Sequence, residues 1–209
     1  MSTIIPVHGN YQELESYRNC VIIYDGTADF CNRFLKKGDR TIDQMIQAAR
    51  SGKQNIVEGC MASGTSTETE TELKLIGVAR ASLEELLEDY RDHLRTRDLP
   101  LWEKTDPRIL AIRELSCRKN RTYETYKTYL EQGHNSPELF CNVMISLIHQ
   151  TNYLLDRHLK SLEQHFAEKA VSGSGCTGPE MLKETVSGKK RLFCFAKYTG
   201  NWHHTISRC

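Results

Sequence analysis

The sequence predicts an all-α protein: an antiparallel up-down four-helix bundle with a helical excursion between helices 3 and 4. Apolar residues recur at three- and four-residue steps along four long stretches, as the buried face of a helix requires. Short turns rich in glycine, serine and proline separate these stretches, and short turns make consecutive helices antiparallel neighbours. The alternation of apolar and polar residues that marks a strand does not occur before residue 190.

The first long helix is predicted from residue 13 to Gly38, after an extended leader over residues 1–12. Its apolar residues follow heptad spacing, and glycine suits the C-terminal stop of a helix. Gly26 lies inside the helix at a cost of about 1 kcal/mol relative to alanine. We therefore expect a close contact or a slight bend at Gly26.

The second helix is predicted over residues 41–62, and the other helices are arranged around it. Thr41 and Gln44 match a capping box at its start. Small residues in its middle allow another helix to approach closely, and the third helix has a matching stretch, so we expect these two helices to pack antiparallel there. The small residues are Ala48, Ala49, Ser51 and Gly52 in helix 2, and Gly77, Ala81 and Ser82 in helix 3.

The third helix is predicted from residue 66 to about Arg97. Pro107 suits the first turn of a helix, and residues 108–131 are expected to form one broken helix or two short ones. After a glycine turn, the last long helix is predicted over residues 137–169. Its inward face is expected to comprise Phe140, Val143, Leu147, Thr151, Leu154, Leu155, Leu159, Leu162 and Phe166.

Composition argues against several classes of protein. The formal net charge is +1, which gives no global electrostatic case for nucleic acid or membrane. The eight cysteines include no C-x-x-C pair, so a structural zinc site has no support. We find no signal peptide and no apolar run of about 18 residues, so we expect a soluble, cytoplasmic protein with no membrane span. Five cysteines are expected as small core hydrophobes: Cys20, Cys31, Cys60, Cys117 and Cys141.

Two segments are locally basic on this nearly neutral chain. Residues 33–53 and residues 108–127 each carry six cations against two acidic residues. Cations bind phosphate, and side-chain amides bond to the backbone or to base edges. The candidate nucleic-acid contacts are Arg40, Arg50, Lys53, Gln54, Arg118, Lys119, Arg121 and Lys127.

Several of these polar residues have a structural alternative. Asn55 and Glu58 can instead pair with Arg80 between helices as a structural polar network, because buried polar groups need partners. Lys53 can instead lie on an ordinary solvated face.

Three tyrosines follow the second basic segment at three-residue spacing: Tyr123, Tyr126 and Tyr129. Aromatic rings interleaved with cations are typical of a platform on which nucleic-acid bases stack. The same spacing places the rings on one side of a helix, so packing onto the bundle explains them as well.

Catalysis has little support in the sequence, and no catalytic residue, metal ligand or cofactor is predicted. A di-iron bundle needs paired Glu-x-x-His elements, and the single match, Glu131 with His134, lies in a glycine turn. The segment from Ser51 to Lys53 lacks the first glycine and the final Ser/Thr of a phosphate-binding loop.

The chain resembles the bacterial four-helix-bundle proteins of the 23S rRNA intervening-sequence type, over roughly residues 4–169. The segments that carry the resemblance are IYDGTADFCNRFL, DRTIDQMIQAARSGKQNIVEG, GVARASLEELLEDYRDHLR and LLDRHLKSLEQHF. The subgroup with a C-terminal suffix domain is the more similar one, and the family resembles the accessory protein of diversity-generating retroelements. The resemblance implies a bundle protomer, a homopentamer, and a basic surface that meets nucleic acid or a reverse transcriptase.

The chain changes character at residue 170, where the predicted bundle (residues 13–169) gives way to an irregular tail (residues 170–209). The suffix subgroup continues here with a basic stretch resembling Gly-Gly-Phe-Arg-Glu-Arg-Met-Tyr-Arg-Ala-Arg. A one-nucleotide shift near codon 170 converts one possible coding of residues 170–180 into that stretch. We therefore hypothesise that the tail is out-of-frame and disordered, which sequencing the gene would test.

These observations lead us to expect a non-catalytic, self-associating accessory or scaffold protein that associates with nucleic acid, with RNA as the expected ligand. The alternative is a protein-binding adaptor ring, for example for a reverse transcriptase, that does not touch nucleic acid.

Overall fold

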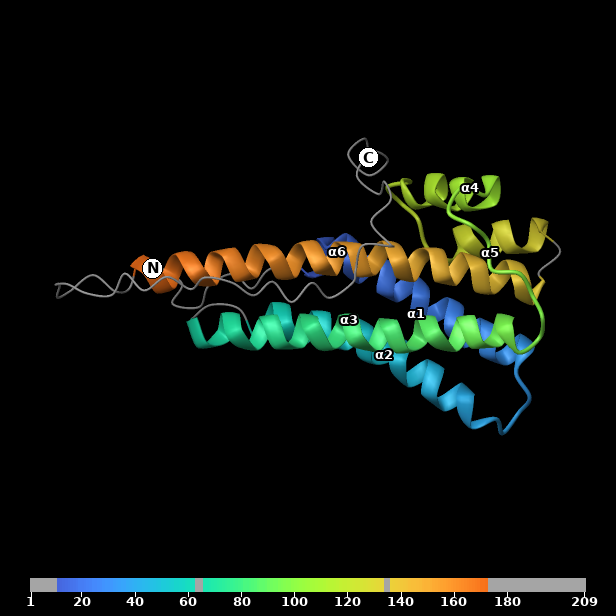
Figure 1. Cartoon of the computed structure of the whole chain (residues 1–209), viewed down its shortest axis with the longest axis horizontal. Coiled ribbons are helices and arrows are strands. Elements are labelled where there is room, and N and C mark those ends of the chain that lie inside the picture. Colours follow the sequence, from blue (N-terminus) through green and yellow to red (C-terminus); the bar gives the residue numbers. More distant parts are fainter. Residues whose placement is uncertain (1–10, 63–65, 134–135, 173–209) are drawn as a thin grey trace, which may run out of the picture. The chain divides into compact units, whose positions relative to one another are not determined.

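A computed structural model describes residues 11–62, 66–133 and 136–172, and these residues form helices and turns with no strand. The all-α prediction is confirmed for this part of the chain. A short 3-10 helix, η1, is followed by six α-helices (Figure 1). Their bounds are η1 Tyr11–Glu13, α1 Glu15–Phe34, α2 Arg40–Met61, α3 Ser66–Arg95, α4 Pro107–Ser116, α5 Tyr123–Gln132 and α6 Pro137–Ser172.

Each of the four long helices packs against two of the others. α1 packs against α2, α2 against α3, α3 against α6, and α6 against α1. The two short helices form a hairpin on the outside of this set, with α4 on α6 and α5 on α1 (Figure 1). The predicted excursion between the third and fourth long helices is therefore two short helices.

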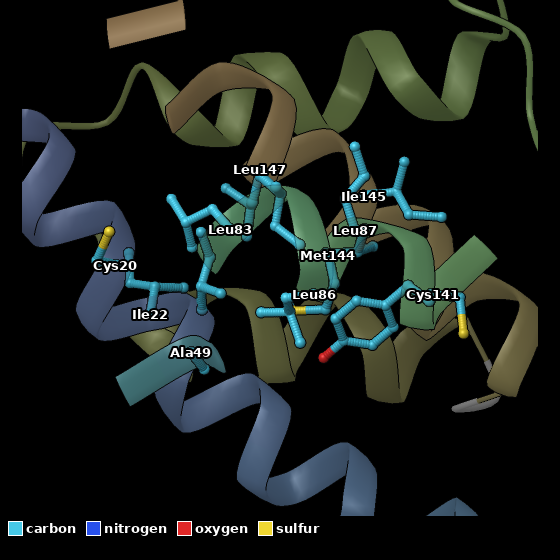
Figure 2. Packing of buried hydrophobic residues seen from close by; sticks show 14 of the residues in the cluster. Cys20, Ile22, Ala49, Leu83, Leu86, Leu87, Cys141, Met144, Ile145 and Leu147 are labelled. Carbon is cyan, nitrogen blue, oxygen red and sulfur yellow. The ribbon is translucent and has the colours of Figure 1, made fainter. Parts of the chain in front are cut away.

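The core is aliphatic and aromatic, and all six α-helices contribute buried residues to it. Figure 2 shows labelled residues of this core from α1, α2, α3 and α6. α6 is the most enclosed element, because α1, α3 and α4 all pack on it, and each of its residues from Leu139 to Ile148 is buried. The rings of Phe30 and Tyr90 meet edge to face with centroids 5.0 Å apart. Such pairs stabilise a core beyond the area they bury.

The close approach of α2 and α3 depends on Gly52. A Cβ atom at Gly52 would lie 2.9 Å from Cδ2 of Leu83, so a side chain there must displace its neighbour. Next to this pair in the sequence, the Ser51 and Ser82 hydroxyl oxygens lie 2.9 Å apart and share a hydrogen bond. The predicted close approach through the small residues of α2 is confirmed.

The small stretch predicted for α3 is only partly correct. Ala81 is exposed, and a Cβ atom at Gly77 would meet nothing within 4 Å, so neither residue lies in the contact with α2. The close contact expected at Gly26 is confirmed, since a Cβ atom there would lie 2.8 Å from the sulfur of Met144 on α6.

Two predicted helix ends differ from the structure. α1 ends at Phe34 rather than at Gly38, and Gly38 instead supplies the positive φ of 90° in the turn that follows. The cap of α2 is not the capping box of Thr41 and Gln44. α2 begins one residue earlier, and the Asp39 carboxylate accepts a hydrogen bond of 2.9 Å from the Thr41 backbone N–H. A carboxylate caps this helix because it also complements the helix dipole.

Two further predictions are wrong, and both concern residues away from the core. Phe166 is 38 % exposed rather than buried, because α6 is longer than the helices that flank it. Cys117 is exposed, while Cys20, Cys31, Cys60 and Cys141 are buried. α6 continues to Ser172, three residues past the predicted bundle. Tyr11 and Gln12, predicted as the end of the extended leader, lie in the 3-10 helix η1. Residues 1–10 of that leader, His134 and the rest of the tail lie outside the described residues.

Candidate nucleic-acid interface

The outer side of α2 presents two cations to solvent. Arg40 and Arg50 are both exposed, and neither makes an ion pair with any described residue. Ten residues of helix place them about 15 Å apart along α2. Gln54 follows Arg50 by one turn and is half-buried. We call Arg40, Arg50, Lys53 and Gln54 the α2 strip.

Lys53 is not an ordinary solvated lysine. It is half-buried, and its Nζ lies 4.0 Å from the centroid of the Tyr24 ring on α1, which is a cation–π contact. Burial raises the pKa of the neighbouring Asp25 carboxyl, and the charge of Lys53 opposes that rise. Lys53 therefore extends the positive charge of the α2 strip toward α1.

The structural network predicted for Asn55, Glu58 and Arg80 does not form. The Asn55 amide donates to the carbonyl and hydroxyl oxygens of Ser51, at 2.8 and 3.0 Å, within α2 itself. Glu58 is exposed. Arg80 donates from Nε to Asp156 on α6 at 2.5 Å, because it lies on the side of α3 that faces α6.

The second group of predicted contacts lies in and after the turn between α4 and α5. These residues differ in how exposed they are and in whether a carboxylate pairs with them. Arg118 and Lys119 are exposed and make no ion pair with a described residue. The Arg121 side chain is only 7 % exposed and is bound to Glu15 and Asn19 of α1, which argues against a phosphate contact in this conformation. Lys127 lies 3.8 Å from Glu124, so its charge is partly compensated.

The tyrosines of α5 pack against neighbouring helices and do not form a stacking platform. Tyr126 is fully buried, and its hydroxyl lies 3.0 Å from the hydroxyl of Ser116 on α4. The Tyr123 hydroxyl donates to the Asp29 carboxylate of α1, and Tyr129 is half-buried. The packing alternative is therefore the correct one for these three residues.

The structure does not bring the two cationic groups together. Arg121 places the α4–α5 turn beside Glu15, the first residue of α1, whereas Arg40 starts α2 just after α1 has ended. α1 has 20 residues and is therefore about 30 Å long. A single short ligand cannot reach Arg40 and Arg118 at once, so the α2 strip and the α4–α5 turn are separate candidate surfaces.

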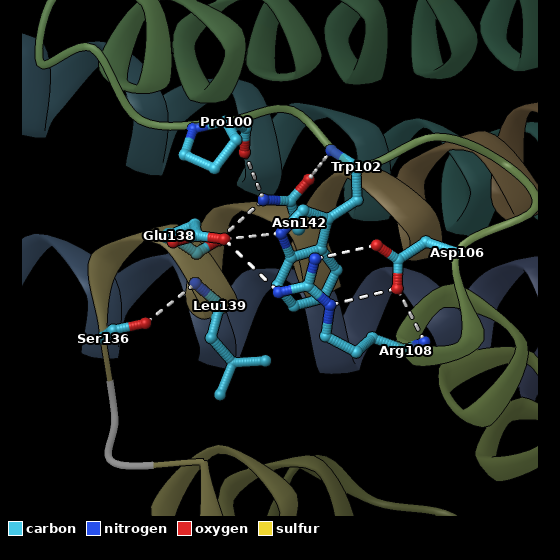
Figure 3. Close-up of polar contacts among 8 residues, drawn as sticks. All are labelled: Pro100, Trp102, Asp106, Arg108, Ser136, Glu138, Leu139 and Asn142. Carbon is cyan, nitrogen blue, oxygen red and sulfur yellow. Dashed lines mark hydrogen bonds and ion pairs between the residues drawn. The ribbon is translucent and has the colours of Figure 1, made fainter.

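Sequence reasoning missed a polar cluster that anchors the hairpin to α6 (Figure 3). The Trp102 indole N–H donates to Glu138 at 2.6 Å, and the Arg108 guanidinium lies 3.7 Å from the centroid of the Trp102 ring. Hydrogen bonds from Arg108 hold the pKa of Asp106 below its usual value. Asn142 accepts a 2.8 Å hydrogen bond from the Trp102 backbone. A tryptophan in a connector is the sequence feature that indicated a buried contact there. Its partners on α6 could not be identified from the sequence, because they are 36 and 40 residues away.

The buried thiols are poorly suited to nucleophilic chemistry. Burial raises the pKa of Cys20 and of Cys141 to about 12, and of Cys31 and Cys60 to about 11. A thiolate is the reactive form, so these groups are largely unreactive at neutral pH. Within the described residues, no group of three His, Cys, Asp or Glu side chains could hold a metal ion.

Comparison of the chain with protein-family models, with curated proteins and with solved structures found no match. Among the helices that the structure describes, none is both long enough and apolar enough to cross a membrane. The geometry thus defines an all-helical protein with two separate surfaces that carry exposed cations.

Proposed function

We propose that this protein is a non-catalytic accessory or scaffold protein that binds nucleic acid, with RNA as the expected ligand. In this proposal the four long helices form an antiparallel up-down bundle, and copies of the chain associate into a cytoplasmic homo-oligomer, a pentamer by the family resemblance. The observation that carries the proposal is the α2 strip, where Arg40 and Arg50 are exposed and have no carboxylate partner among the described residues.

Phosphate groups bind readily to surface arginines that have no carboxylate partner. A guanidinium presents several donors in a fixed plane, and binding a phosphate releases condensed counterions from the nucleic acid. Most arginines of α1 and α3 are already engaged: Arg18 with Glu15, Arg33 with Asp29, and Arg91 with Glu88 are examples. Arg40 and Arg50 differ from these, and Gln54 adds an amide that can bond to phosphate or to base edges.

The test is binding of a fluorescently labelled oligouridylate, measured by anisotropy at low salt. The double variant Arg40→Glu/Arg50→Glu should weaken binding by at least about 30-fold, because each reversal turns an attraction into a repulsion. The control is Arg157→Glu/Lys160→Glu on α6, which reverses two exposed cations outside the strip. Equal losses in both variants would show that only net charge matters and would refute the site assignment.

The alternative, a protein-binding adaptor, is favoured by a groove beside the α2 strip, where α2 meets α3. An open groove of about 680 Å³ lies between α2 and α3. Its lining comprises Asp43, Gln44, Ile46, Gln47, Ala48, Ser51, Ser82 and Glu85. Two carboxylates and no cation in this lining would repel phosphate, so a protein segment suits the groove better. A complex with a partner protein that persists at high salt, together with no binding of oligonucleotide, would favour the adaptor.

A further inference from the structure

The buried guanidinium of Arg121 is poorly satisfied where it lies. Its side chain is 7 % exposed, and its terminal nitrogens donate to Asn19 at 2.8 Å, to Glu15, and to the Arg118 carbonyl at 3.3 Å. Its Nε is buried and has no hydrogen-bond partner. A buried donor without a partner carries its full desolvation cost.

The counter-charge of Arg121 is also shared. Glu15 accepts from Arg121 on Oε2 and from Arg18 on Oε1, the latter at 3.1 Å. One carboxylate therefore serves two guanidinium groups, so Arg121 does not have a full counter-charge of its own. Burial of a guanidinium without a full counter-charge is unfavourable.

The hairpin is anchored to different helices at its two ends. At the base, Trp102, Arg108, Glu138 and Asn142 form a connected cluster between the connector and α6 (Figure 3). At the tip, the ties to α1 are Arg121 and the hydrogen bond from Tyr123 to Asp29. The apolar side chains buried by the hairpin are Ile109, Ile112 and Leu115 from α4 and Tyr126 and Leu130 from α5.

The topology allows the tip to move without disturbing the long helices. The hairpin is inserted between α3 and α6, and those two helices pack directly on each other. Its tip can therefore separate from α1 while the contact between α3 and α6 remains. Parts of a protein that can separate while the remaining helices stay packed open at a lower free energy than the whole molecule does.

We infer that the α4–α5 hairpin is a strap that opens at its tip, and that a polyanion selects the open form. Opening releases Arg121 from Glu15, so that it joins the exposed Arg118 and Lys119 in one turn of three cations. The affinity of this turn is then limited by the fraction of molecules that are open. The choice of a polyanion as ligand rests on the proposed function, whereas the opening of the hairpin does not depend on that function.

The experiment compares Glu15→Gln with Glu13→Gln. Both variants remove one exposed carboxylate from nearly the same place, but only Glu15 is bound to Arg121. Hydrogen exchange of the intact protein without ligand should be faster in residues 117–132 of Glu15→Gln than in wild type, with α2 and α3 unchanged. Glu13→Gln should exchange like wild type.

The same variants are then titrated with the labelled oligouridylate. Glu15→Gln should bind about three-fold more tightly than Glu13→Gln, since loss of an ion pair of this kind shifts an equilibrium by that order. Saturating oligouridylate should also speed exchange in residues 117–132 of the wild type.

Equal exchange in the two variants would overturn the strap, whether or not the protein binds nucleic acid. Faster exchange in Glu15→Gln with no binding by any variant would leave the strap standing and refute the proposed function. Slower exchange of the wild-type tip on saturation would show that the closed form binds, which would refute selection of the open form.

Discussion

Gly52 and Gly77 form a matched pair that tests how α2 and α3 pack. Both are glycines inside long helices, and replacing either by alanine removes the conformational cost of glycine, which is worth about 1 kcal/mol in a helix interior. They differ in what the new methyl group would meet. At Gly77 nothing lies within 4 Å, whereas at Gly52 the Leu83 Cδ2 and Cγ atoms lie 2.9 and 3.0 Å away.

The magnitude follows from these distances. Leu83 is fully buried, so it cannot turn away into solvent, and forcing a methyl group into such a site costs about 1–3 kcal/mol. After the gain of about 1 kcal/mol in helix propensity, Gly52→Ala should lower the free energy of unfolding by roughly 0–2 kcal/mol. Gly77→Ala should raise it by about 0.5–1 kcal/mol.

The assay is urea unfolding of both variants and of wild type, followed by far-UV circular dichroism. The two midpoints should lie on opposite sides of wild type or, at the least, Gly52→Ala should be less stable than Gly77→Ala by about 1–3 kcal/mol. If Gly52→Ala were as stable as Gly77→Ala, then α2 and α3 would not approach as closely as the structure shows.

Two further predictions concern buried polar groups. Burial, with a smaller contribution from the charge of Arg97, lowers the pKa of His93 from 6.5 to about 4, so the unfolded chain binds more protons between these values. The protein should therefore lose stability as pH falls from about 6.5 to 4. His93→Phe should reduce that loss by on the order of 1–2 kcal/mol, measured by comparing urea midpoints at neutral and acidic pH. A pH dependence that is the same in His93→Phe and wild type would contradict this. Trp102→Phe should lower the free energy of unfolding by about 1–3 kcal/mol, because it removes the hydrogen bond to Glu138 and weakens the contact with Arg108. Trp102→Leu should lower it further, since it also removes the aromatic ring. Equal stability of wild type and Trp102→Phe in thermal unfolding would show that the cluster does not anchor the hairpin.

Periodicity predicted the long helices well, because their buried faces repeat every three or four residues regardless of what they pack against. Helix ends depended on single groups. The carboxylate of Asp39, and not the hydroxyl of Thr41, caps α2, because the helix begins one residue earlier than predicted.

The sequence could not supply the partners of polar side chains on different helices. Arg80 pairs with Asp156 and Arg121 with Glu15, and these partners are separated from them by 76 and 106 residues. The pairing depends on which sides of two helices face each other, which periodicity does not specify for polar residues. Arg50 was easier to place, because it is exposed on the outer side of an amphipathic helix.

The salt dependence of oligouridylate binding shows whether the α2 strip contacts phosphate. The logarithm of the oligouridylate association constant should fall linearly with the logarithm of salt concentration, with a slope of about −0.7 for each phosphate contact. Arg40→Gln/Arg50→Gln should make that slope shallower by about 1.4 relative to wild type, since it removes two contacts. A slope that is the same in wild type and variant would mean that neither arginine meets a phosphate, and the assignment of the α2 strip would be wrong.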